Sequence, residues 1–272
     1  MRRLALALLA SALLLPVSVQ AQEEGEPQAA EPAAEPAAEP APEPPADPFA
    51  DLLAEASRKW WSRDGKGVTQ AMITKMEAAE AEHADSYALQ VELARWLYWQ
   101  ASSVGGGAAE ATLGKKGWDH AEKAKALNPA GVEGYYWAAA NIGAYSRGSG
   151  IINAVRQGLA DEFKANGMKA IEINANHDSG GPLRAMGRYY FSLPWPLQDL
   201  DEARKYLERA VKVDPNSAIN KFYLAELEVE EGNTEAARKL CNEILAIDVS
   251  KADPPSTRKN QVNAKALLAE LD

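Results

Sequence analysis

Three histidines are the residues of this sequence most suited to metal binding or to proton transfer at neutral pH. His83, His120 and His177 are all expected near helix ends, and none has a second ligand at the spacing of a metal site or a catalytic pair. We therefore predict surface or helix-capping roles for them. No acid, base and nucleophile stand together in a catalytic pattern, so the sequence predicts a protein that is not an enzyme, with no cofactor and no metal.

Two glycine-rich stretches and one cysteine are further candidates for chemistry. Gly105-Gly106-Gly107 lacks the Lys-Ser/Thr pair of a phosphate-binding loop and follows a predicted helix, so we expect the loop between two paired helices. Gly148-Ser149-Gly150 is expected to be an inserted turn. Cys241 is the only cysteine. It cannot form an internal disulfide or accept a lipid anchor at a signal cleavage site, and we predict a small buried hydrophobic residue there.

Aromatic residues are more informative, because they occur in short runs. The runs are Trp96, Tyr98 and Trp99; Tyr135, Tyr136 and Trp137; and Tyr189, Tyr190 and Phe191. Most large rings in a helical array pack between helices. Successive residues on a helix point about 100° apart, however, so the members of a run cannot all face the core. Some of these rings must reach a groove or the solvent.

The elements that position these residues follow from an internal repeat. Four segments end a helix with a similar stop signal, and they begin at Ala124, Ala170, Ala210 and Ile244. The last two are 34 residues apart, which is the tetratricopeptide period, and the earlier gaps of 46 and 40 are that period with insertions. The match extends through the unit. Ala203, Leu207 and Ala210 recur as Ala237, Cys241 and Ile244.

The repeat predicts an all-α fold, a tetratricopeptide-type helical-repeat solenoid of about five helix pairs with a C-terminal capping helix. No strand pattern is present. The predicted pairs cover residues 49–63 with 67–84, 86–129, 131–176, 181–215 and 217–249, and the capping helix covers 261–271.

The register of the repeat predicts a binding face. Small residues are expected where paired helices cross, at Ala94, Ala139, Gly187 and Ala225. This register places a set of aromatic and basic residues on the concave side, where such arrays bind their partners. The candidate binding residues are Arg95, Tyr98, Trp99, Tyr136, Arg184, Arg188, Phe191 and Phe222.

The arginines of this set allow two interpretations, which the sequence leaves open. Arg95, Arg184 and Arg188 could hold a carboxylate by forked hydrogen bonds. Alternatively, Arg95 and Arg188 could pair across the groove with acidic residues of the protein. Those residues are Glu92, Glu133 and Glu226.

The N-terminal segments predict export. Arg2 and Arg3 precede an apolar run and a small-residue cleavage site after Ala21, so residues 1–21 are expected to be a cleaved signal peptide that leaves no membrane span. Residues 22–49 contain eight acidic residues, no basic ones and eight of the 16 prolines, which predicts a disordered acidic tether. The repeat domain, 50–272, then carries 27 basic and 31 acidic residues, a net charge of −4 against −10 for the whole chain. This balance gives no support to nucleic-acid binding.

The stretch from Arg184 to Ala203, with Tyr189-Tyr190-Phe191 and Pro194-Trp195-Pro196, resembles the TRAP transporter T-component (TatT) family. Trp61-Ser-Arg63 and Gly134-Tyr-Tyr-Trp137 are also similar to this family, and the resemblance covers most of residues 50–250. It implies a partner, because members are thought to associate with the periplasmic solute-binding protein that captures small organic acids. The sequence departs from the family in having no acylatable cysteine and in its acidic tether.

Together these patterns predict a periplasmic or secreted scaffold for protein–protein interaction. The expected partner is an envelope protein, the solute-binding component of a TRAP-type transporter. Two alternatives remain open at the level of the sequence. One is a carrier for an organic acid, with a carboxylate ligand in the groove, and the other is a general cell-envelope assembly scaffold.

Overall fold

The computed structural model describes residues 48–271, and this part of the chain forms twelve α-helices and one 3-10 helix without any strand. The predicted signal peptide, and the predicted tether except for its last two residues, lie outside the described residues. The helices are α1 Ala50–Trp60, α2 Val68–Glu82, α3 Tyr87–Ala101, α4 Gly107–Leu127, α5 Val132–Ser149, α6 Ile151–Arg156, α7 Leu159–Asn174, α8 His177–Ser192, α9 Leu200–Val213, α10 Ala218–Glu230, α11 Thr234–Leu245, η1 Val249–Lys251 and α12 Pro254–Glu270.

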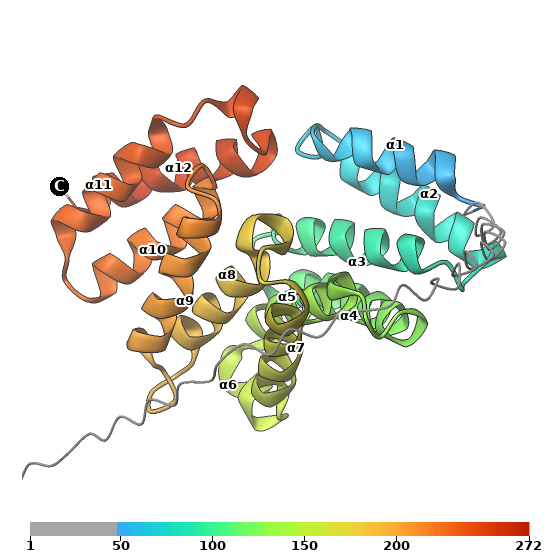
Figure 1. Cartoon of the computed structure of the whole chain (residues 1–272), viewed down its shortest axis with the longest axis horizontal. Coiled ribbons are helices and arrows are strands. Elements are labelled where there is room, and N and C mark those ends of the chain that lie inside the picture. The colour runs from blue at the N-terminus through green and yellow to red at the C-terminus, as the bar shows by residue number, and fades with distance from the viewer. Residues whose placement is uncertain (1–47, 272) are drawn as a thin grey trace, which may run out of the picture. The chain divides into compact units, whose positions relative to one another are not determined.

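The helices pair in the order that the repeat predicts. α1 packs with α2, α3 with α4, α5 with α7, α8 with α9 and α10 with α11, while α12 covers α10 and α11 (Figure 1). Polar residues fix several helix starts, because the side chains of Ser86, Asp199 and Ser217 each accept a hydrogen bond from the backbone amide three residues further on. The prediction of an all-α helical-repeat solenoid is confirmed.

Two helix boundaries differ from the prediction. Residues inserted into the third pair form the short helix α6, and the expected turn at 148–150 is the end of α5 followed by Gly150 at φ 93°. The capping helix begins at Pro254 rather than at Gln261. It starts earlier because the Asp253 side chain accepts a hydrogen bond from the Ser256 amide, and proline is favoured in the first turn.

The predicted crossing positions lie in the core. Ala94, Ala139 and Ala225 are fully buried. At Gly187 a Cβ atom would lie 2.6 Å from Cγ of Leu207, so only glycine allows α8 and α9 to approach this closely. Cys241 is buried between α10, α11 and α12, as predicted.

Helices α4 and α5 approach each other closely at several glycines, Gly114 and Gly117 among them. A Cβ atom at Gly114 would lie 2.5 Å from the backbone nitrogen of Tyr145, and one at Gly117 would lie 2.2 Å from Oδ1 of Asn141. The amide of Asn141 donates a hydrogen bond to the Ala94 carbonyl at 3.0 Å and so joins α5 to α3. Backbone atoms at Gly114 and the Asn141 side chain at Gly117 therefore set the separation of these helices.

Phe49, the last residue of the predicted tether, belongs to the core. It is 8% exposed, and its ring meets the His83 ring edge-on at 5.8 Å. Because it lies at the edge of the first apolar cluster, we expect Phe49→Ala to destabilise the protein by about 2 kcal/mol, less than a central phenylalanine would. Urea denaturation followed by circular dichroism measures this loss. Deletion of residues 22–47 is the matched control, and its composition predicts an unchanged midpoint.

Candidate functional site

A cavity of about 290 Å³ opens on the face formed by the first helix of each pair. Its walls come from α1, α3, α5, α8, α10 and α12, so both ends of the repeat contribute to it. We call it the inner cavity. Trp60, Trp99 and Trp137 supply aromatic surface, and Arg63, Arg184 and Lys259 supply positive charge. Such a mixture of flat apolar walls and a few polar groups is typical of ligand-binding sites.

The structure brings half of the predicted binding residues to this cavity. Those that line it are Tyr98, Trp99, Tyr136 and Arg184. Arg95 does not line it, and Arg188 lines a separate hollow of about 80 Å³ beside α6 and α7. Phe191 and Phe222 pack against buried clusters between α8, α9 and α10 and between α10, α11 and α12.

Arg95 and Arg188 are ion-paired within the protein. Arg95 lies 3.1 Å from Glu92 and its guanidinium stacks 3.7 Å from the Trp60 ring. Arg188 lies 2.8 Å from Glu226. Burial raises the pKa of Glu226, and the charge of Arg188 opposes that rise. Of the two interpretations left open for Arg95 and Arg188, the structure shows ion pairs, which join neighbouring repeats for Arg188 but lie within α3 for Arg95.

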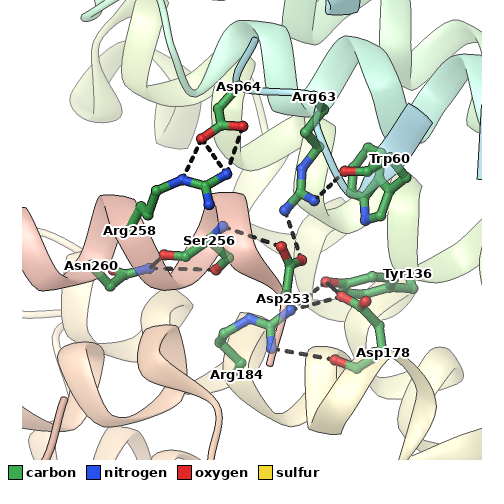
Figure 2. Close-up of polar contacts among 10 residues, drawn as sticks. All are labelled: Trp60, Arg63, Asp64, Tyr136, Asp178, Arg184, Asp253, Ser256, Arg258 and Asn260. Carbon is green, nitrogen blue, oxygen red and sulfur yellow. Dashed lines mark hydrogen bonds and ion pairs between the residues drawn. The ribbon is translucent and has the colours of Figure 1, made fainter. Parts of the chain in front are cut away.

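Arg184 is the centre of a buried polar network on α8 (Figure 2). Its guanidinium donates to Tyr136 Oη at 2.7 Å, to Asp178 Oδ2 at 2.9 Å and to Asn220 Oδ1 at 2.9 Å. Burial disfavours the charged form of Arg184, but the neighbouring oxygens of Tyr136 and Asp178 outweigh burial and raise its pKa. Burial also raises the pKa of Tyr136, so its hydroxyl stays protonated and donates to Asp178 at 2.7 Å.

This network also holds an unusual backbone turn in place. Asp178 and Ser179 have positive φ angles of 49° and 57°, which residues other than glycine rarely adopt. Arg184 and Tyr136 bind the side chain of Asp178, and Asn220 donates to the Ser179 carbonyl at 2.9 Å. Arg184 therefore positions the start of α8 as well as one wall of the inner cavity.

Arg63 is a second buried arginine at the cavity, and it was not among the predicted binding residues. Its guanidinium lies between the Trp60 and Trp99 rings, at 3.9 and 4.1 Å from their centroids. It donates to the Trp60 carbonyl at 2.8 Å and to Asp253 at 2.7 Å (Figure 2). Asp253 follows Arg63 by 190 residues, so this ion pair joins the two ends of the repeat.

Two more polar contacts join the same ends. Arg258 binds Asp64 through two hydrogen bonds of 2.8 and 2.9 Å, and Lys259 donates to the Ser102 carbonyl at 2.8 Å (Figure 2 draws the first pair). We call these contacts, with the Arg63–Asp253 pair, the seam. Within residues 48–271, α12 packs on α10, α11 and η1 but not on α1, α2 or α3, and no buried apolar cluster crosses the seam.

Comparison with known proteins identifies the fold. Residues 197–254 match the family described as "Tetratricopeptide repeat". A thermophilic tetratricopeptide repeat protein of Thermus thermophilus is similar in structure, with a TM-score of 0.60 and 17% identity over 80% of this chain and 99% of that one. The chain folds as a tetratricopeptide-type helical repeat. At this level of identity the likeness shows the fold alone.

Two further comparisons were less informative. Yeast Tom70 aligns with a TM-score of 0.29 and 14% identity, over 84% of this chain and 66% of that chain. No curated protein matches the sequence. Tetratricopeptide repeat proteins generally act as scaffolds for protein–protein interaction rather than as enzymes, and no catalytic family is indicated. These comparisons support the predicted tetratricopeptide repeat, and the TatT family stays a prediction.

The histidines of the repeat lie in three different environments. His83 ends α2, and His177 begins α8 with its ring 5.4 Å from Tyr136. His120 is buried in α4 and shares a 2.8 Å hydrogen bond with Gln90, so the expectation of a surface or capping role is wrong for this residue. Burial lowers the pKa of both His120 and His177. Among the described residues no group of three possible metal ligands gathers around a common point.

In the part of the chain that the structure describes, no helix combines the length and apolarity needed to cross a membrane.

Proposed function

We propose that this protein is an exported scaffold that docks a partner protein of the cell envelope on its inner face, and that the partner is the solute-binding component of a TRAP-type transporter. The observation that carries the proposal is the inner cavity, which collects aromatic and cationic side chains from every helix pair. Tetratricopeptide arrays bind partners on this face. A cavity of about 290 Å³ takes inserted side chains or an extended segment rather than a folded domain. The TatT resemblance supports a transporter component as the partner, and the predicted signal peptide supports a location in the cell envelope.

An exposed aromatic residue supports a protein partner. Trp195 is 88% exposed on the loop between α8 and α9, within the stretch that carries the TatT resemblance. Two hydrogen bonds hold this loop, from Gln198 to the Phe191 carbonyl at 2.9 Å and from the Asp199 amide to the Tyr190 carbonyl at 3.2 Å. Tryptophan is enriched among the residues that contribute most to protein–protein binding. A large ring on an ordered loop is suited to such a contact.

Co-purification from an envelope extract, followed by calorimetry with the purified partner, tests this function. Asn216 and Asn263 line the inner cavity and are not fully buried, so larger side chains at these positions should narrow the cavity without disturbing the core. For the double variant Asn216→Arg and Asn263→Arg we expect at least a tenfold loss of affinity for the partner, about 1.4 kcal/mol. Trp195→Ala should weaken the same complex.

Val262→Arg is the matched control, because Val262 neighbours Asn263 on α12 but is 67% exposed and lies outside the cavity. Unchanged affinity for the cavity-narrowing variant would place the docking surface elsewhere. Capture of an unrelated envelope protein would contradict the transporter assignment but not the docking face.

A further inference from the structure

The inner cavity contains polar groups that the protein leaves without partners. Tyr98 and Tyr223 line it, and neither hydroxyl forms a hydrogen bond to any of the described residues. Lys259 donates to the Ser102 carbonyl, but no carboxylate of residues 48–271 lies within 4 Å of its ammonium. Arg63 and Arg184, in contrast, are already paired with Asp253 and Asp178. Tyr98 and Tyr223 thus offer two free hydroxyls, and Lys259 offers an ammonium whose charge no carboxylate of the described residues balances.

The side chains that line the cavity carry a net positive charge. Four cationic and three acidic side chains line the cavity, which leaves one positive charge in excess. Lys259 is exposed at the mouth of the cavity, but partial desolvation of its ammonium and then the positive charge of Arg147 lower its pKa, while Glu110 opposes this shift. A lysine in such surroundings is stabilised by an anion placed beside it. Burial raises the pKa of Tyr98, so its hydroxyl is a hydrogen-bond donor at neutral pH.

The shape and the acidic groups of the cavity limit which anions can bind. The Lys259 ammonium lies 5.5 Å from the centroid of the Trp99 ring, and Trp60 and Trp137 extend the aromatic wall. These rings suit an apolar body attached to the charged group. A singly charged carboxylate balances the excess of one, whereas a phosphate dianion would bring a second negative charge toward Asp178 and Asp253.

We propose that the inner cavity binds an organic carboxylate with an apolar body, its carboxylate paired with Lys259, its body against Trp99 and its farther polar groups within reach of Tyr98 and Tyr223. Lys259 belongs to α12, whereas Tyr98 and Trp99 belong to α3, so the ligand contacts both sides of the seam. Binding therefore favours the joined seam, and a broken seam weakens binding. The inference rests on the proposed role of the inner face, and the carboxylate comes either from a free organic acid or from a polypeptide.

Titration of the intact protein with simple probes tests the site. Benzoate and hexanoate are the free acids, benzamide and inorganic phosphate are the controls, and a short peptide is used with a free or an amidated C-terminus. Tryptophan fluorescence reports binding, since Trp60 and Trp99 line the cavity. We expect the carboxylates to bind with Kd below about 1 mM, and Lys259→Met to weaken them at least tenfold. Lys265→Met, an exposed position on the same helix outside the cavity, should change Kd less than about twofold.

Coupling to the seam is tested by charge reversal. Arg258 does not line the inner cavity. Arg258→Asp should nevertheless weaken benzoate several-fold, because it opposes Asp64, and the double variant Asp64→Arg with Arg258→Asp should restore the affinity. Binding of the free peptide alone would identify a polypeptide as the source of the carboxylate and would still support the site.

The site is wrong if no carboxylate binds, or if Lys259→Met binds benzoate as the unaltered protein does. It is also wrong if benzamide or phosphate binds as tightly as benzoate. Trp195→Ala separates this result from the proposed function, because it should weaken the partner and leave benzoate binding unchanged. A failed titration with intact partner capture would therefore overturn the carboxylate site only.

Discussion

Arg184→Met is expected to destabilise the repeat domain by about 3 kcal/mol. The change removes hydrogen bonds to Tyr136, Asp178 and Asn220. Removal of one member of a buried ion pair costs about 3 to 5 kcal/mol of stability. We place the loss at the lower end, because the Asp178 side chain is 38% exposed and water can solvate it after the arginine is lost. Chemical denaturation followed by circular dichroism measures the effect.

Arg258→Met is the comparison variant for Arg184. Its ion pair with Asp64 has two hydrogen bonds but is exposed at the surface, so its loss should cost less than about 1 kcal/mol. Equal, small losses for both variants would show that the Arg184 network contributes little to stability. The positive φ angles of Asp178 and Ser179 would then need another cause.

Gly114→Ala is expected to cost at least about 3 kcal/mol, at the upper end of the range for an overpacked core. The added methyl group would lie 2.5 Å from the backbone nitrogen of Tyr145 and 3.0 Å from the Asn141 carbonyl oxygen. A backbone atom cannot rotate away as a side chain can. The only relief is to separate α4 from α5, which would also weaken their packing on α3.

Gly143→Ala on α5 is the matched control. The nearest atom to its methyl group is Cε2 of the Phe163 ring at 3.2 Å, and a ring edge can shift by a few tenths of an ångström. Alanine is also preferred to glycine inside a helix by roughly 0.5 to 1 kcal/mol, so this variant should be close to neutral. A melting temperature for Gly114→Ala equal to that of Gly143→Ala would show that α4 and α5 are less closely packed than described.

The sequence predicted those features that depend on local patterns. Helix pairs, crossing residues such as Ala94 and Ala225, and the buried Cys241 follow from a 34-residue period and from residue size. The start of α12 could also be predicted, because Asp253 followed by Pro254 and Pro255 is a recognised helix-start signal. The predicted start at Gln261 did not take this signal into account.

The features that the sequence could not predict depend on distant residues. Whether Arg63 meets Asp253 depends on the small rotation that each repeat adds, summed over 190 residues, and on the insertions at α6 and at the loop before α9. For the same reason the register placed Arg188 in the groove, although Glu226 on the neighbouring repeat binds it. The period of a repeat fixes which face is concave, but not which side chains meet across it.

The seam changes how the ends of this array should unfold. In an open array each repeat is stabilised only by its neighbours, so the terminal repeats fray first and independently of each other. Here Arg63 and Asp64 at the first pair are bonded to Asp253 and Arg258 at the last helix. Fraying at one end therefore removes contacts that also hold the other end. Hydrogen-exchange protection of α1–α2 and α12 should rise and fall together, although more than a hundred residues of folded chain separate them in sequence.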